Sequence, residues 1–119
     1  MPKLVHTRDG RFLGEIVLQE GTLHIGRDRG CDIPLDDDTV SARHTRVTVR
    51  PSAYLEGLLD ILVEDQGSTN GTWLGRRRLD KRHMLKHDET LRIGAHEFTL
   101  IDEITRGMET TTIILPDEA

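Results

Sequence analysis

The chain of 119 residues is 35% hydrophobic and 31% charged, carries a net charge of −5, and has one Trp, one Tyr and two Phe. This length predicts one domain with a core of Leu, Ile and Val, and the negative charge argues against nucleic acid as a partner. No stretch resembles a membrane span or a secretory signal, and the single Cys31 allows no internal disulfide, so we expect a soluble cytoplasmic protein without a membrane partner.

The negative charge is concentrated at the C-terminus. From Asp102 onward five acidic residues are opposed only by Arg106, which gives this segment a net charge of −4 and leaves −1 for the residues before it. An anion-binding site would therefore have to be a local group of cations rather than a field over the whole surface.

Apolar and polar residues alternate along most of the chain, with the period of two that is typical of strands. In chain order, the alternating pairs are Ile16 and Leu18, Leu23 and Ile25, Ile33 and Leu35, Val47 and Val49, Ile61 and Val63, Leu91 and Ile93, and Phe98 and Leu100. Turn-forming sequences separate them: Asp9-Gly10, Glu20-Gly21, Arg29-Gly30, Pro51-Ser52, Asn70-Gly71 and Gly94-Ala95. Many short strands separated by turns predict an all-β sandwich or barrel.

Three segments do not fit tight hairpins. Residues 52–59 are interpreted as a loop insertion in which Ser52 could cap a short turn. The connections over residues 26–43 and 65–72 are long, and long loops on a rigid sandwich are common binding sites.

The sequence changes character after position 102. We assign residues 1–102 to the folded domain and residues 103–119 to a C-terminal tail that we expect to be mobile. Residues 109–116 are rich in β-branched side chains, so an additional edge strand is the alternative.

Three short polar elements lie at predicted strand–loop junctions: Gly26-Arg27, Ser41 to His44, and Ser68-Thr69-Asn70-Gly71-Thr72. Together they offer guanidinium groups, hydroxyls and an amide. This set fits a dianionic phosphate, because arginine forms charge-assisted bidentate hydrogen bonds and the other donors can satisfy the remaining oxygens.

The order and spacing of these elements resembles the forkhead-associated (FHA) domain, whose pattern reads Gly-Arg, then Ser-x-x-His, then Ser-x-Asn-Gly-Thr. The resemblance covers residues 3–101. It implies an eleven-stranded β-sandwich of two twisted sheets, of the SMAD/FHA type, whose apical loops bind phosphothreonine peptides.

The resemblance also implies a role for each matching residue. Arg27 and Ser41 would contact the phosphate, Arg43 and Thr69 would add donors, and Asn70 would hold the peptide main chain. The residues that would shape the loops without touching the ligand are Gly26, His44, Ser68 and Gly71, with Asp65 bracing the last loop.

Two positions depart from the family pattern. Gly75 stands where the family often has Asn, which removes a possible loop tether. His87 replaces the Gly of a common Gly-Asp turn, and because His tolerates the left-handed region we expect the turn to persist.

Other chemistry is weakly supported. Ser41 and His44 could be read as nucleophile and base, but no orienting acid accompanies them, so we predict that the protein is not an enzyme. The six histidines are scattered, and His83 and His87 lie in a turn-rich stretch, so we predict no metal site. We also predict no cofactor. The run Asp36 to Asp38 lacks a calcium-loop register and is interpreted as a solvated loop or a turn cap.

A basic run follows the third element: Arg76, Arg77, Arg78, Lys81 and Arg82. We favour a charged hairpin edge that resists aggregation. The alternative is a strip that attracts acidic phosphopeptides or a partner protein, while nucleic acid would require stacking aromatics.

The tail contains three candidate phosphorylation sites: Thr110, Thr111 and Thr112. Some FHA proteins carry a flanking Thr-Thr segment that a kinase phosphorylates and the domain then captures, and Ile114 lies three residues after Thr111. One hypothesis is a phosphorylated tail that occupies its own or a neighbour's site, and the other is a tail without this role.

These features predict a phosphothreonine-dependent protein-interaction module, a signalling adaptor that acts downstream of a Ser/Thr kinase. Thr39 and Trp73 are candidates for lining the pocket of the third residue after phosphothreonine. The alternative is a phosphate-independent module for scaffolding or oligomerisation.

Overall fold

A computed structural model describes residues 1–102, and this part of the chain consists of strands and loops without a helix. In chain order the strands are β1 (Lys3–Arg8), β2 (Arg11–Val17), β3 (Gly21–Gly26), β4 (Ile33–Pro34), β5 (Thr45–Pro51), β6 (Leu59–Asp65), β7 (Thr72–Leu74), β8 (Arg77–Arg78), β9 (His83–Met84), β10 (Thr90–Ile93) and β11 (His96–Ile101). These eleven strands within residues 1–102 confirm the predicted all-β fold.

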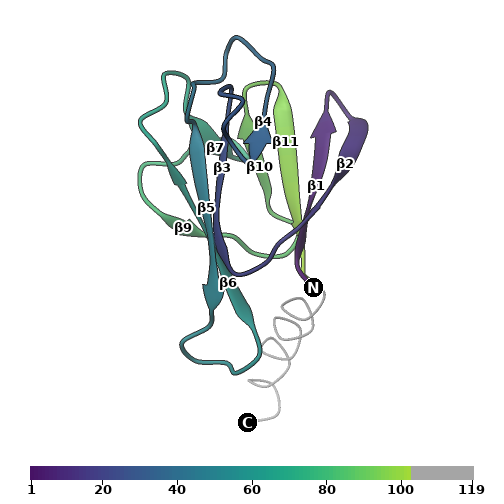
Figure 1. The fold of residues 1–119 in the computed structure, drawn as a ribbon, viewed down its shortest axis with the longest axis vertical. Helices are drawn as coiled ribbons and strands as arrows, with labels where there is room; N and C mark the ends of the chain where they lie inside the picture. The colour runs from purple at the N-terminus through teal and green to yellow at the C-terminus, as the bar shows by residue number, and fades with distance from the viewer. Residues whose placement is uncertain (103–119) are drawn as a thin grey trace.

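The strands form two sheets that pack face to face (Figure 1). The six-stranded sheet has the order β2-β1-β11-β10-β7-β8, and the five-stranded sheet has the order β4-β3-β5-β6-β9. Within residues 1–102 all pairs are antiparallel except β3 with β4. The sandwich that the sequence predicts is therefore correct.

The core lies between the sheets and is almost entirely aliphatic. Leu4 and Phe98 from the larger sheet and Val47 and Val63 from the smaller one are fully buried. Val47 pairs with Val63 across β5 and β6, so the alternating pattern directs both side chains to the same face. The composition predicted such a core, because only four aromatic side chains were available.

Four strands were missed by periodicity. Strand β1 buries Leu4 but places the polar His6 two residues later, so the apolar alternation is lost. Strands β7, β8 and β9 have three, two and two residues, which is too short to show a period.

The β1–β2 hairpin uses the predicted Asp9-Gly10 turn. Both residues have positive φ, 51° and 78°, as a two-residue type I′ turn requires. The same requirement explains Gly75, whose φ of 61° in the β7–β8 turn is one that Asn also tolerates.

The turn at His87 and Asp88 persists, as expected, but His87 is not its left-handed residue. The left-handed residue in this turn is Asp88, with φ of 70°, while His87 accepts a hydrogen bond on Nδ1 from the Asp102 backbone N–H at 2.9 Å. Asp adopts this region by hydrogen-bonding locally, so the turn does not depend on histidine.

The loop insertion over residues 52–58 is a loop, as predicted. The Ser52 hydroxyl accepts hydrogen bonds from the backbone N–H groups of Tyr54 and Leu55, at 3.2 and 3.1 Å. No helix in residues 1–102 has the length and apolarity to cross a membrane. The tail assigned to residues 103–119, with Thr110, Thr111 and Thr112, lies outside the described residues.

Two histidines are paired inside the larger sheet. His6 Nε2 and His96 Nδ1 are 2.8 Å apart, and the His6 ring stacks on Phe98 with centroids 4.4 Å apart. Burial, and then the neighbouring His96, lower the pKa of His6. Burial also lowers the pKa of His96, an effect that Asp37 opposes and Arg8 assists.

We predict that the fold loses stability as the pH falls below about 6.5. Because both pKa values are lowered, the unfolded chain takes up protons first, so this stabilisation is complete above the unfolded pKa of 6.5 and is lost as the pH falls through the folded values. Urea denaturation at about pH 7.5 and about pH 5.5 measures it. A His6→Gln, His96→Gln double variant should show a smaller difference, and an unchanged difference would contradict the prediction.

Candidate functional site

The three polar elements predicted from the sequence meet at one end of the sandwich. They occupy the β3–β4 loop after Gly26, the β4–β5 loop before Thr45, and the β6–β7 loop over residues 66–71. The loops lie at the top of the molecule in Figure 1.

Gly26 allows the first two loops to approach each other closely. A Cβ at this position would lie 2.2 Å from the Ala42 carbonyl oxygen, so any side chain would displace backbone. Beyond it, the N–H of Arg27 donates to the Ser41 carbonyl at 3.0 Å and the N–H of Asp28 to that of Ala42 at 3.1 Å. These bonds fix the backbone that carries Arg27.

His44 joins the second loop to the third. Its imidazole is completely buried, Nδ1 accepts a hydrogen bond from the Ser41 N–H at 3.1 Å, and Nε2 lies 2.7 Å from the Gly71 carbonyl oxygen. A carbonyl can only accept, so Nε2 carries the proton and Nδ1 does not. The ring is therefore a neutral bridge between the two loops.

Asp65 organises the third loop from within. Its carboxylate accepts hydrogen bonds from the Ser68 N–H at 2.9 Å, the Ser68 hydroxyl at 2.5 Å and the Thr72 hydroxyl at 2.7 Å. Burial raises the pKa of Asp65, but these bonds from Ser68 and Thr72 outweigh burial, so the pKa lies below its ordinary value. The Ser68 oxygen then accepts from the Gly71 N–H at 2.9 Å, where Gly71 has φ of 88°.

The residues predicted to contact phosphate lie on the outer surface of these loops. Arg27 and Arg43 are exposed, and neither guanidinium forms a hydrogen bond or an ion pair within residues 1–102. The Ser41 oxygen accepts from the Thr69 N–H at 3.1 Å, which leaves the Ser41 hydroxyl proton available as a donor.

Asn70 is partly engaged. Its side-chain Nδ2 donates to the Thr39 backbone carbonyl at 2.8 Å, and its backbone carbonyl accepts from the Trp73 indole N–H at 3.0 Å. Its Oδ1 and second amide proton have no partner within residues 1–102.

A cavity of about 470 Å³ adjoins Asn70 on the side of the β10–β11 turn. Thr39 and Trp73, the two residues proposed for a peptide side-chain pocket, both line it, together with Arg8 and Arg92. The Arg92 guanidinium carbon lies 5.5 Å from the Trp73 ring centroid.

Asp37 caps the β4–β5 loop beside this cavity. It accepts from the hydroxyl and N–H of Thr39, at 2.6 and 2.9 Å, and from the Ala95 N–H at 3.1 Å. The hydrogen bond from the Thr39 hydroxyl, with help from both N–H groups, outweighs burial and lowers the pKa of Asp37 to about 2. The middle residue of the acidic run therefore serves as a turn cap.

The geometry gives no support for catalysis or for metal. His44 contacts the Ser41 backbone rather than its hydroxyl, so the pair is not a nucleophile and base. Within residues 1–102, no group of three His, Cys, Asp or Glu side chains is arranged to hold a metal ion.

Arg78 was not among the predicted site residues. Its Nη2 lies 3.5 Å from the Thr69 carbonyl oxygen, and its side chain covers Gly71. The sequence placed Arg78 in a basic run, but only the pairing of Arg78 with Trp73 across β7 and β8 brings it to the third loop.

Comparison with known proteins gives a consistent result. The FHA domain family matches residues 23–94. FhaB, an FHA domain-containing protein of Mycobacterium tuberculosis, is 35% identical over 91 residues, which cover 76% of this chain and 54% of FhaB. The chain thus spans about half the length of the curated relatives that it matches.

Two solved structures are similar to this chain in sequence as well as in fold. An FHA domain from a structural and functional analysis of phosphothreonine-dependent FHA domain interactions has a TM-score of 0.69 and 27% identity, covering 85% of this chain and 95% of that one. Mycobacterium tuberculosis EmbR in complex with a low-affinity phosphopeptide has a TM-score of 0.67 and 28% identity, covering 84% of this chain and 24% of EmbR.

We predict that Asp65→Asn destabilises the domain by about 2 kcal/mol, because an amide nitrogen would face groups that donate to the carboxylate. Urea denaturation near neutral pH measures the loss. The matched control is Asp36→Asn, since Asp36 is exposed and makes no hydrogen bond or ion pair within residues 1–102. Equal stability of the two variants would contradict the prediction.

Proposed function

The chain belongs to the FHA domain family, and we propose that it is a phosphothreonine-dependent protein-interaction module whose apical loops bind a phosphorylated peptide or protein. The observation that carries this proposal is that the guanidinium groups of Arg27 and Arg43 are exposed and unpaired within residues 1–102, on the two loops that the backbone bond from Arg27 to Ser41 joins. A phosphothreonine brings a charge of about −1.5 to −2 and three acceptor oxygens, which such donors would satisfy.

Each residue has a distinct proposed role. Arg27 and Ser41 contact the phosphate, Arg43 and Thr69 supply further donors, and the remaining amide groups of Asn70 bind the peptide main chain. The cavity lined by Thr39 and Trp73 takes a side chain that follows the phosphothreonine. The backbone bonds at Gly26 and the His44 bridge support this surface, because they hold it before ligand arrives.

The proposed mechanism is recognition without catalysis. We place the module in the cytoplasm, downstream of a Ser/Thr kinase, where Cys31 can remain a thiol. Burial, with the nearby Asp28, raises the pKa of this thiol and keeps it unreactive. A phosphate-independent scaffold on the same sandwich is the competing function, and partner binding that survives phosphatase treatment would favour it.

We predict that Arg27→Ala abolishes measurable phosphopeptide binding without unfolding the protein, because an exposed arginine whose side chain has no partner within residues 1–102 contributes little to the fold. Calorimetry with a phosphothreonine peptide, beside its unphosphorylated form, measures binding. The control is Arg50→Ala, because Arg50 is also exposed but lies at the end of β5 that is remote from the β4–β5 loop. Retained binding by Arg27→Ala would refute the role of this residue.

The Thr-rich tail extends the proposal to regulation. If a kinase phosphorylates Thr111, the chain supplies its own phosphothreonine, and the tail can occupy the site of the same or a neighbouring molecule. Thr110 and Thr112 are adjacent candidates. Such capture would couple the phosphorylation state of the tail to the availability of the site.

We predict that a tail peptide phosphorylated at Thr111 shifts the amide resonances of Arg27 and Ser41 in a chain that ends at Asp102. The unphosphorylated peptide should leave both resonances in place, because the phosphate provides the charge that the site recognises. Unshifted resonances with the phosphorylated peptide would refute tail capture but not binding of another phosphoprotein.

A further inference from the structure

The segment between β7 and β9 forms a cationic strip that the proposed phosphate site does not use. We define the cationic strip as Arg76, Arg77, Arg78, Lys81 and Arg82. All five side chains are exposed. Because Asp80 is the one acid among residues 76–82, the segment has a net charge of +4 in a chain whose net charge is −5.

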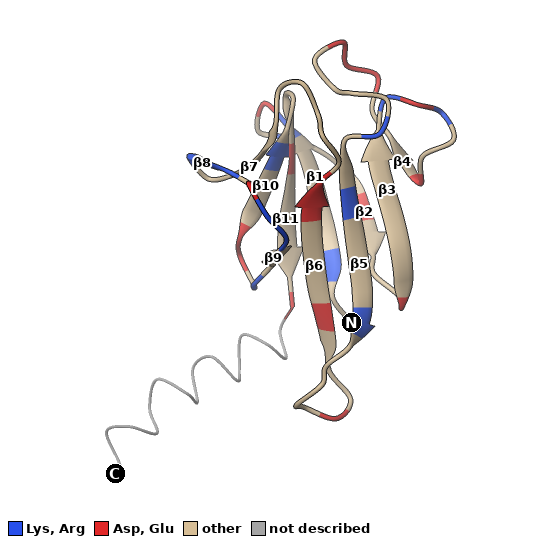
Figure 2. Ribbon diagram, turned by 90° about the vertical axis from the view of Figure 1, so that its left-hand side faces the viewer, with Lys and Arg blue, Asp and Glu red and all other residues tan. Residues whose placement is uncertain are grey.

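The strip crosses from one sheet to the other along the side of the sandwich. It begins at the β7–β8 turn and β8, the edge of the six-stranded sheet, and ends before β9, the edge of the five-stranded sheet. Figure 2 shows this course as blue ribbon on β8 and in the segment leading to β9.

The charge of the strip is not compensated within residues 1–102. None of the five cations forms an ion pair there. Apart from Asp80, which belongs to the segment itself, the acids that line the two cavities beside the strip are engaged elsewhere. Glu64 pairs with Arg46, Asp65 accepts from Ser68 and Thr72, and Glu89 accepts from the Lys86 N–H and contacts His83 at 3.2 Å. An external anion would therefore meet unpaired cations.

The strip is continuous with the proposed phosphate site. Arg78 reaches the β6–β7 loop through its contact with the Thr69 carbonyl and covers Gly71. Lys81 and Arg82 also line a cavity of about 320 Å³ together with Gly67 of the same loop, and this cavity has three acids in its wall, Glu64, Asp65 and Asp80. The strip thus flanks the loop that carries Thr69 and Asn70.

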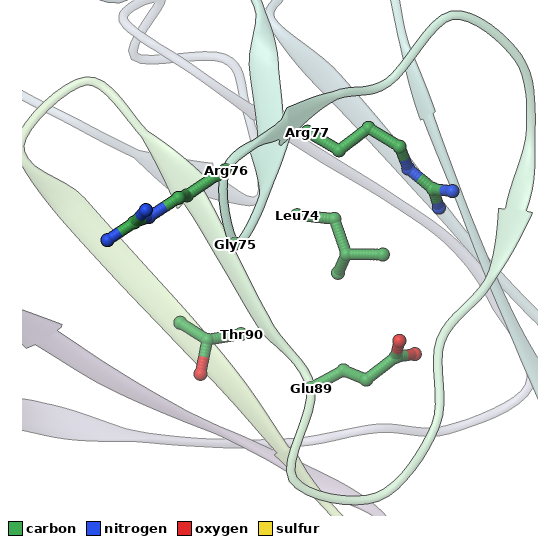
Figure 3. A pocket seen from close by; sticks show the side chains of 6 residues that line it. All are labelled: Leu74, Gly75, Arg76, Arg77, Glu89 and Thr90. Atoms are coloured by element: carbon green, nitrogen blue, oxygen red, sulfur yellow. The ribbon is translucent and has the colours of Figure 1, made fainter.

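The outer end of the strip borders a shallow hollow of about 670 Å³ (Figure 3). Leu74 lies in its centre, and the side chains of Arg76 and Arg77 extend to opposite sides of it. A bound peptide that extends from the apical loops along this side of the sandwich would pass between the side chains of Arg76 and Arg77.

Protection of a sheet edge does not account for this charge. Strand β8 has only two residues, and a strand so short is already a poor template for pairing. Lys81 and Arg82 lie in the loop before β9, an edge strand that also has only two residues, so the same argument applies there. Nucleic acid is also a poor match, because Trp73 is the one aromatic residue near the strip and it already contacts Arg92 and Asn70.

We propose that the cationic strip is a second anion-binding surface that takes acidic residues of the same partner whose phosphothreonine occupies the apical site. This inference rests on the proposed function, since the phosphothreonine anchors the partner beside the strip. The strip adds affinity for partners with an acidic segment next to the phosphothreonine. It therefore selects the class of partner that the domain binds.

The test uses the full chain and three phosphothreonine peptides: one with neutral flanks, one with glutamates before the phosphothreonine and one with glutamates after it. One acidic peptide should bind about tenfold more tightly than the neutral peptide at low salt, because several exposed ion pairs form together. High salt should reduce this gain.

An Arg77→Gln, Arg82→Gln variant should lose most of the gain and bind the neutral peptide as the unmodified chain does. The matched control is Arg11→Gln, Arg50→Gln, two exposed cations on other strands.

The outcomes separate the two proposals. If the unmodified chain does not bind the neutral-flank peptide, the proposed function fails. If that peptide binds but neither acidic peptide gains, or the gain persists in the Arg77, Arg82 variant, the strip inference alone is overturned. Two further results would overturn it in favour of other anions: a gain that appears only after residues 103–119 are removed, or single-stranded DNA binding that the variant abolishes without changing peptide affinity.

Discussion

The apical surface depends on one buried imidazole. His44 accepts a hydrogen bond from the Ser41 N–H and donates one to the Gly71 carbonyl, so a single rigid ring sets the distance between two loops that are far apart in the sequence. Only the neutral ring with its proton on Nε2 can make both bonds. Because the ring is completely buried, its loss would leave two polar backbone groups without partners as well as a cavity.

Around this bridge, the acidic groups of the site form hydrogen bonds within the loops, whereas the basic groups face outward. The carboxylates of Asp65 and Asp37 are turned into the loops, where hydroxyls and backbone N–H groups satisfy them. The guanidinium groups of Arg27 and Arg43 remain outside and unpaired within residues 1–102. The exposed Asp28, which follows Arg27, accepts from the Gly30 N–H at 2.9 Å and forms no ion pair with either arginine within residues 1–102. The two guanidinium groups therefore keep their charge for the anionic ligand that we propose.

The sequence predicted those parts of the fold that depend on local patterns. Strands such as β5 and β6 alternate cleanly because one face of each is buried, and the Asp9-Gly10 turn follows from the φ values that these residues tolerate. Strand β1 was missed because His6, which contacts His96 of β11, takes the place of an apolar residue after Leu4. The proposed site residues were found through a family pattern, whereas Arg78 was found only through cross-strand pairing, which no local pattern encodes.

The tight contact at Gly26 has a consequence for the thermodynamics of binding. Since the Ala42 carbonyl leaves no room for a side chain there, and the Arg27 and Asp28 N–H groups are already bonded, this backbone has little freedom left to lose. The entropic cost of ordering this backbone after Gly26 is therefore incurred when the protein folds rather than when a ligand binds. If the proposed phosphopeptide binds here, its association should be limited by diffusion and charge attraction rather than by a slow rearrangement of this backbone.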